Sequence, residues 1–171
     1  EIFIDPLTLL FNRKAFNDKM EAYMQAFTAE KKIFSVIIID IDSFKKFNDQ
    51  HGHLVGDQVL KFLGSLLTKE LKGKDFVARY GGEEFIILLE NTHLTNAAIV
   101  ANNIRHSLDG VKLKYMKTGE VLGNITISAG VATVCNGDTA LSLLNRVDAA
   151  LYLAKQNGRN AVKTEQDVAL Q

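Results

Sequence analysis

Apolar residues recur along the chain with two different periods, and these periods predict helices and strands. Over 16–27, 59–67, 98–108 and 141–154 the apolar residues return every three or four positions, as they do on one face of a helix. The run 33–41 is apolar at nearly every position, which is typical of a strand buried on both sides. Further strands are expected at 76–80, 84–89, 111–117, 121–134 and 160–163.

Turn and cap residues divide these elements. The pair Gly81-Gly82 joins two β-rich runs and predicts a tight hairpin. Thr95 and Asp138 are candidate N-caps, and Gly158 is a candidate helix stop. The central order of strand, helix, strand, strand, helix, strand predicts an α+β, ferredoxin-like (βαββαβ) core: an antiparallel-rich sheet with helices on one face. Because many functions use that fold, function has to be argued from the site.

Composition and charge narrow the class of protein. The 171 residues are 47% apolar and 23% charged, which predicts one globular domain over 1–171, and the abrupt start suggests a domain excised from a longer chain. Twenty basic residues balance twenty acidic ones, so broad nucleic-acid binding is not expected. With no apolar run of about 18 residues and a single cysteine, Cys135, we expect a cytoplasmic domain that makes no membrane contact of its own.

Acidic residues stand at the ends of two expected strands. Asp40 closes the buried run, and Glu83 and Glu84 follow the Gly81-Gly82 turn. If these strands are neighbours, Asp40 and either glutamate converge on one divalent metal, the device that stabilises the leaving group in nucleotidyl transfer. Each feature alone has a structural alternative: Asp40 as a loop-starting residue and the glutamates as a solvated hairpin tip.

The polar segment 43–57 adds candidates for nucleotide binding. Backbone N–H groups of residues 43–45, at a short helix start, can cradle phosphate, and Asn48 with Asp57 can read a guanine edge. The alternatives are local, with Asp57 as an N-cap and Asn48 as a cap or turn residue. His51 and His53 have no nearby third ligand, so zinc is not expected.

Basic residues complete the set of candidates. Lys155 and Arg159, four positions apart, can clamp phosphates, or they can simply oppose the macrodipole at a helix C-terminus. Arg79, just before the hairpin, is a phosphate partner or a structural one. The chain has neither the glycine-rich phosphate loop nor the dinucleotide fingerprint, so a nucleotide would be bound by other means.

The order and spacing of these motifs are more specific than any one of them. Together they resemble the GGDEF domain family, the bacterial diguanylate cyclases with a palm-like nucleotidyl-cyclase fold, over nearly the whole chain. The matching segments are 5–8 (DPLT), 12–13 (NR), 40–48 (DIDSFKKFN), 51–53 (HGH), 56–57 (GD), 79–85 (RYGGEEF), 128–131 (SAGV), 148–155 (DAALYLAK) and 158–160 (GRN).

The resemblance implies that two GTP molecules become cyclic di-GMP and two pyrophosphates, with Mg²⁺ or Mn²⁺ as cofactor. It implies that Asp40, the Ile41 carbonyl, Glu83 and Glu84 hold the metal, and that Glu83, supported by Glu84, activates the 3′-hydroxyl. One domain has room for one GTP, so a second copy of the domain is the expected partner, together with an N-terminal sensory or dimerisation domain. The implied substrate contacts are Ser43, Phe44, Lys45, Asn48, His53, Asp57, Arg79, Lys155 and Arg159.

Two positions depart from the family pattern. Leu9 stands at a turn where the family has glycine. The family's inhibitory product site, Arg-x-x-Asp, corresponds here to the stretch from Lys72 to Asp75, and lysine lacks the planar fork of arginine, so we expect weak product inhibition. Two other functions stay open: a catalytically silent sensor that binds GTP or cyclic di-GMP, and a protein-interaction domain whose polar clusters are structural.

Overall fold

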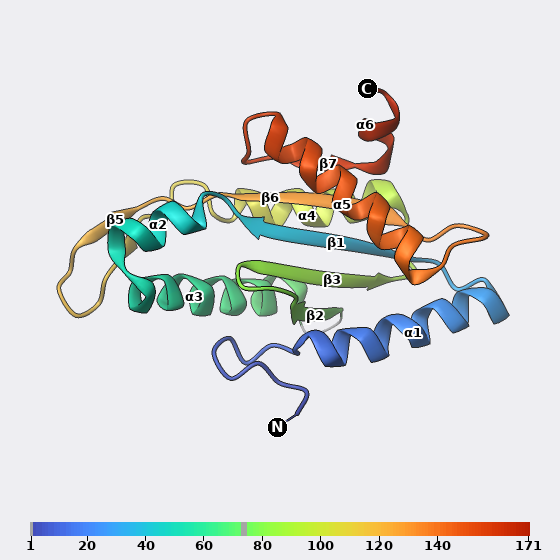
Figure 1. Cartoon of the computed structure of the whole chain (residues 1–171), viewed down its shortest axis with the longest axis horizontal. Coiled ribbons are helices and arrows are strands. Elements are labelled where there is room, and N and C mark those ends of the chain that lie inside the picture. Colours follow the sequence, from blue (N-terminus) through green and yellow to red (C-terminus); the bar gives the residue numbers. More distant parts are fainter. Residues whose placement is uncertain (1, 73–74) are drawn as a thin grey trace.

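The computed structural model describes residues 2–72 and 75–171. Its centre is a five-stranded sheet with the strand order β2-β3-β1-β6-β7 (Figure 1). All neighbouring strands are antiparallel except β6 and β7, which are parallel, so the expected α+β fold with an antiparallel-rich sheet is confirmed. The strands of the sheet are β1 (Phe34–Ile41), β2 (Phe76–Arg79), β3 (Glu84–Glu90), β6 (Ile127–Thr133) and β7 (Val162–Thr164).

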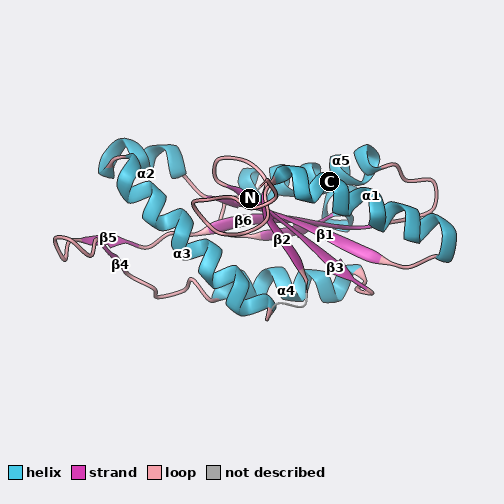
Figure 2. Cartoon of the chain, turned by 90° about the horizontal axis from the view of Figure 1, so that it is seen from below, coloured by secondary structure: helices cyan, strands magenta, loops and turns pink. Residues whose placement is uncertain are grey.

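Helices cover both faces of this sheet. The expectation of helices on one face holds for the helices inside the βαββαβ core and leaves out α1 and α5, which cover the other face. Figure 2 shows α3 and α4 on one side of the strands and α1 and α5 on the other. Inside the βαββαβ order, α2 and α3 lie between β1 and β2, and α4 follows β3, while α1 precedes that order and α5 follows β6. The helices are α1 (Arg13–Glu30), α2 (Phe44–His51), α3 (His53–Leu71), α4 (Leu94–His106), α5 (Ala140–Gln156) and α6 (Glu165–Ala169).

Each face of the sheet buries its own apolar core. Strand β1 is buried at all eight positions, and its side chains alternate between the two cores. Ile37 and Ile39 pack in the core formed with α3 and α4, whereas Val36 and Ile38 pack in the core formed with α1 and α5. The continuous apolar run at 33–41 therefore reflects burial from both sides, as predicted.

Several element boundaries differ from the sequence predictions. Helix α3 begins at His53 with Gly52 (φ +90°) before it, so Asp57 lies inside the helix and is not its N-cap. Helix α4 begins at Leu94, ahead of Thr95. Helix α5 is capped by Thr139, in a capping box with Ser142, and not by Asp138.

The region between α4 and α5 is more broken than expected. Only β4 (Leu113–Lys114) and β5 (Val121–Gly123) form within the first part of it, and this small hairpin projects from one end of the molecule (Figures 1 and 2). The expected strand 121–134 is divided because Gly123 adopts φ +87°, which turns the chain between β5 and β6. Among the described residues, no helix is long and apolar enough to cross a membrane.

The N-terminal segment is closed by a turn around Asp5. The backbone N–H and the hydroxyl of Thr8 both donate to Asp5 Oδ2, at 2.9 and 2.7 Å. Leu9 completes the turn with φ +63° while its side chain is 75% exposed. A left-handed leucine is strained and this one buries little, so the position favours glycine.

We therefore expect Leu9→Gly to stabilise the domain, because glycine adopts the left-handed conformation without the steric cost of a Cβ. The melting temperature should rise by about 2–4 °C. Leu141→Gly is the matched control: it removes another exposed leucine, but from within α5, where glycine should lower the melting temperature. A lower melting temperature for Leu9→Gly would contradict the strain argument.

Candidate functional site

Three carboxylates meet at one end of the sheet. In the ladder between β1 and β3, Asp40 lies directly opposite Glu84, and the N–H of Ile41 donates to the Glu83 carbonyl at 3.2 Å. Because side chains alternate along a strand, Asp40 and Glu84 point to the face that α1 and α5 cover. The two strands are therefore neighbours, as the sequence prediction required, and Asp40 lies beside Glu84. Their convergence on one metal stays a prediction.

Burial of these carboxylates changes their ionisation. The Asp40 side chain is only 7% exposed and forms an ion pair with the Lys155 ammonium. Burial raises the pKa of Asp40, while Lys155 and, more weakly, Arg159 oppose the rise. Burial, followed by the charge of Asp40, also raises the pKa of Glu83 and of Glu84. The ionised form of these carboxylates is thus disfavoured, and a neighbouring positive charge would stabilise it.

The donor atoms of this cluster suit a hard divalent cation. Asp40 Oδ1 is buried and has no hydrogen-bond partner among the described residues, so one carboxylate oxygen is left available to a ligand. Over the same part of the chain, no group of three or more His, Cys, Asp or Glu side chains forms a metal cage. Mg²⁺ usually takes one or two carboxylates and completes its shell with phosphates and water, so the predicted set fits Mg²⁺ better than a caged metal.

The turn that carries Glu83 is held by the N-terminal segment. Arg79 donates from Nη2 to the Gly82 carbonyl at 2.9 Å and from Nη1 to Asp5 at 3.3 Å. Arg13 lies 4.2 Å above the Tyr80 ring, and its Nη1 donates to the Tyr80 carbonyl at 3.3 Å. These contacts favour the structural role for Arg79 over the predicted substrate contact.

Helix α5 reaches the site because it packs unusually close to β6. A Cβ added to Gly130 would lie 2.3 Å from the Val147 carbonyl oxygen and 2.4 Å from the Leu151 nitrogen. Only glycine allows this approach, since both atoms belong to the backbone. Lys155, one turn beyond Leu151, is thereby placed within reach of Asp40.

The predicted guanine contacts lie between α2 and α3. A Cβ on Gly56 would come within 1.8 Å of Asn48 Oδ1, so Gly56 makes room for this side chain. Asn48 Oδ1 is buried and, in the described part of the chain, has no hydrogen-bond partner. Asp57 is half-buried next to Gly56, whereas His53 is exposed at the start of α3. A buried acceptor atom of α2 thus lies against α3 at the residue before Asp57.

Of the predicted phosphate contacts at the start of α2, Ser43 and Lys45 are exposed, whereas the Phe44 side chain is buried. Ser43 precedes the helix with φ +55° and makes no side-chain cap, and Lys45 is exposed. The Phe44 side chain packs in the core formed with α3 and α4, so only its backbone N–H is available to a phosphate.

Sequence reasoning missed one charged neighbour of the cluster. The charge of Asp148, on α5, raises the pKa of Glu84 and of Tyr80, and the pKa of Asp148 is itself raised by burial and opposed by Arg13. Asp148 is the first residue of the motif 148–155. Its place on α5, two turns before Lys155, puts it on the same side of the helix as Lys155 and so towards the carboxylate cluster.

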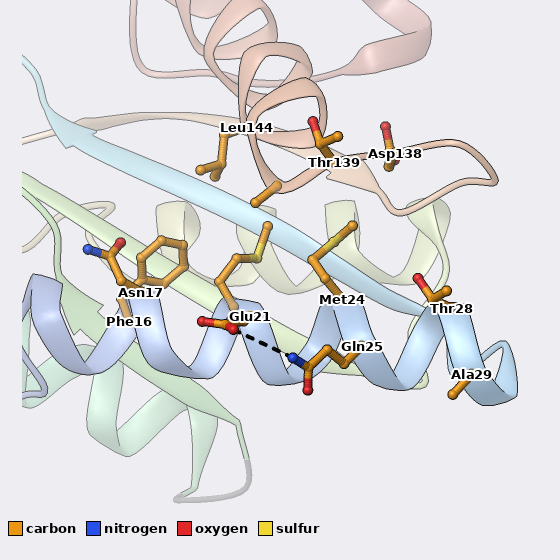
Figure 3. Close-up of a pocket in the computed structure, with 12 residues that line it drawn as sticks. Phe16, Asn17, Glu21, Met24, Gln25, Thr28, Ala29, Asp138, Thr139 and Leu144 are labelled. Atoms are coloured by element: carbon orange, nitrogen blue, oxygen red, sulfur yellow. Dashed lines mark hydrogen bonds between the residues drawn. The ribbon is translucent and has the colours of Figure 1, made fainter.

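A separate cavity of about 650 Å³ lies between α1 and α5 (Figure 3). It is lined mainly by apolar groups, including Phe16, Met24 and Leu144. None of the carboxylates or basic residues of the candidate site lines it. The cavity is therefore distinct from the predicted nucleotide site.

Lys72 and Asp75, the predicted remnant of a product site, lie on either side of residues 73–74, which are outside the described residues. Lys72 ends α3 with φ +53° and is exposed. Asp75 is half-buried just before β2. Burial and then Glu90 raise the pKa of Tyr23, and the charge of Asp75 adds to the rise.

Comparison with known proteins identifies the family. The family model for the diguanylate cyclase GGDEF domain matches residues 2–161, so the chain belongs to the GGDEF family. Response regulator PleD of Caulobacter vibrioides is 40% identical over 159 residues, which are 92% of this chain but 35% of PleD. The chain thus spans about a third of the length of this relative. Dependence on a divalent metal is general in the family.

Solved structures of GGDEF domains have the same fold. The GGDEF domain of DgcB from Caulobacter crescentus, crystallised in complex with c-di-GMP, superposes with a TM-score of 0.93 at 37% identity and covers 97% of both chains. The active GGEEF domain of a diguanylate cyclase from Vibrio cholerae superposes with a TM-score of 0.81 at 38% identity, over 90% of this chain and 96% of that one.

The raised pKa of Glu84 generates a prediction about stability. A carboxyl group whose pKa is higher in the folded than in the unfolded state disfavours folding once it is ionised. We expect Glu84→Gln to raise the melting temperature at pH 7 by about 2 °C. The gain should disappear as the pH falls through the folded-state pKa towards the ordinary value of about 4.3, because Glu84 itself is then protonated.

The control for this measurement is Glu120→Gln, which removes an exposed carboxylate from the β4–β5 hairpin and should leave the melting temperature unchanged. Melting curves between pH 4 and pH 8 test the sign. A Glu84→Gln variant that is less stable at pH 7 than at pH 4, relative to the unaltered protein, would show that the carboxylate is stabilising.

Proposed function

We propose that this domain is a diguanylate cyclase, which joins two GTP molecules into cyclic di-GMP and releases two pyrophosphates. The observation that carries the proposal is the pairing of Asp40 with Glu84 across β1 and β3, with Glu83 next to them on a braced turn. Membership of the GGDEF family supports it, as does the likeness to the active Vibrio cholerae domain, which is also of the GGEEF type.

The proposed roles follow from where the residues lie. Asp40, the Ile41 carbonyl, Glu83 and Glu84 would hold Mg²⁺, or Mn²⁺, whose charge stabilises the pyrophosphate leaving group when it is bound. Glu83, with its raised pKa, takes the proton from the 3′-hydroxyl, and Glu84 supports it. Asn48 and Asp57 bind guanine, with His53 beside the nucleotide, and the N–H groups of residues 43–45 hold the phosphates together with Lys155 and Arg159.

A second copy of the domain is required by the chemistry. Each product molecule contains two nucleotides, and each domain carries one Asn48 and Asp57 pair for a guanine. Two domains therefore face each other, and the 3′-hydroxyl bound by one attacks the α-phosphate bound by the other. We propose that this single domain over 1–171 works in the cytoplasm within a longer chain, whose N-terminal region brings the two copies together.

The decisive experiment separates binding from turnover. The chain, joined to a dimerising coiled coil, is incubated with GTP and Mg²⁺ while cyclic di-GMP and pyrophosphate are measured. Glu83→Gln should lower turnover by about 10²-fold or more, because a general base contributes that much. Its GTP affinity should fall far less. Glu120→Gln should change neither, and undiminished turnover in Glu83→Gln would refute the assignment.

The family's product site has arginine at the position of Lys72, and measurements of product inhibition test the effect of this difference. Lysine lacks the planar fork of arginine, so cyclic di-GMP should inhibit this domain only weakly. Its dissociation constant should be micromolar or higher. Lys72→Arg should strengthen both binding and inhibition, whereas Lys61→Arg, an unrelated lysine on α3, should have no effect. Submicromolar binding of cyclic di-GMP that Lys72→Ala abolishes would show instead that lysine suffices.

A further inference from the structure

Asp42 follows β1 directly, two residues after Asp40, yet its carboxylate is used differently. Asp42 Oδ1 accepts from the Ser128 hydroxyl at 2.6 Å, and Oδ2 accepts from the Thr126 hydroxyl at 2.7 Å. Oδ2 also accepts from the backbone N–H of Asn160 at 2.9 Å. Three neutral donors therefore occupy the oxygens of Asp42, and this carboxylate joins β1 to the start of β6 and to the turn after α5.

The turn after α5 has a conformation that needs an anchor. Gly158, Arg159 and Asn160 all have positive φ, at 97°, 65° and 45°. The left-handed region is disfavoured for residues other than glycine, so the turn is unfavourable unless contacts hold it. The N–H of Arg159 donates to the Ala154 carbonyl at 3.1 Å, and the N–H of Asn160 donates to Asp42.

The same turn carries a basic residue of the candidate site. Arg159 is its middle residue, and the turn directly follows the helix that places Lys155 on Asp40. Arg159 also lines a cavity of about 700 Å³ together with Ser43, another predicted phosphate contact. The strand end thus contacts the end of α5 twice, through Asp40 to Lys155 and through Asp42 to the turn.

We propose that Asp42 is a positioning residue that holds the turn at residues 158–160 and so keeps Arg159 where it binds the triphosphate of GTP. The inference rests on the proposed function, which assigns Arg159 to the phosphates. Asp42 would act through the turn and not on the nucleotide, since its two oxygens accept hydrogen bonds from Ser128, Thr126 and Asn160.

Two substitutions distinguish hydrogen bonding from charge. Asp42→Ala removes both acceptors. Asp42→Asn can keep the arrangement, because the amide oxygen accepts from Thr126 and Asn160 while the amide NH₂ donates to the Ser128 hydroxyl, which is also an acceptor. A residue that acts by positioning should therefore be rescued by asparagine, whereas a metal ligand or a needed negative charge should not.

The first measurement needs no nucleotide. Hydrogen exchange of the Asn160 amide should speed up about tenfold or more in Asp42→Ala and stay near the unaltered rate in Asp42→Asn. The matched control is Asp18→Ala, which removes an exposed carboxylate from α1. Unchanged exchange in Asp42→Ala would overturn the inference that Asp42 anchors the turn.

The second measurement compares GTP with GMP, each with Mg²⁺, on the full chain. Asp42→Ala should weaken GTP binding about tenfold, the effect of one misplaced charged hydrogen bond, and leave GMP binding within twofold. In an Arg159→Ala background, Asp42→Ala should have no further effect on GTP. An equal loss for GTP and GMP, or an additive loss in the double variant, would overturn the positioning role.

The outcomes separate the two proposals. If the unaltered protein fails to bind GTP, the proposed function fails, while the exchange measurement still decides whether Asp42 holds the turn. Loss of GTP affinity in Asp42→Asn would show that the negative charge itself is needed and would overturn the inference. That arm stands even if Asp42→Ala does not fold.

Discussion

The register between β1 and β3 is the constraint on which the site depends. Asp40 faces Glu84 only because the two antiparallel strands pair Phe34 with Glu90 and continue in step to their other ends. A slip of one residue would turn Asp40 towards the core of α3 and α4, where Ile39 and Ile41 pack. Such a slip is costly because it would bury the Asp40 carboxylate among the isoleucines of that core.

That register places negative charges close together, and the structure compensates for only part of the repulsion. Burial raises the pKa of Asp40, Glu83 and Glu84, and the Lys155 ammonium opposes the rise at each of them. One oxygen of Asp40 stays buried without a partner among the described residues. A core designed for stability alone would place apolar residues here. This local instability is what makes a cation a favourable occupant.

The sequence predicted features that depend on local pattern and missed those that depend on distant contacts. The run 33–41 and the Gly81-Gly82 hairpin were predictable, and so was the meeting of Asp40 with Glu84 once the strands were taken as neighbours. The covering of the second face by α1 and α5 was not, since the periodicity of a helix says which residues are buried but not against which face. The contacts of Asp42 join residues 84 to 118 positions apart, which no local pattern reveals.

The close packing of α5 on β6 shows how packing and chemistry are connected in this domain. Gly130 lets the backbone of α5 contact β6, the strand that pairs with β1. The last turn of α5 then lies near Asp40. Lys155 reaches Asp40 from the last turn, and the left-handed turn that follows is bound by Asp42. Because the helix axis is fixed by backbone contacts, the two basic residues at its end are placed by the core and not by the flexibility of their own side chains. The motif 128–131 thus acts on this end of the sheet through Gly130, which lets α5 approach, and through Ser128, whose hydroxyl donates to Asp42.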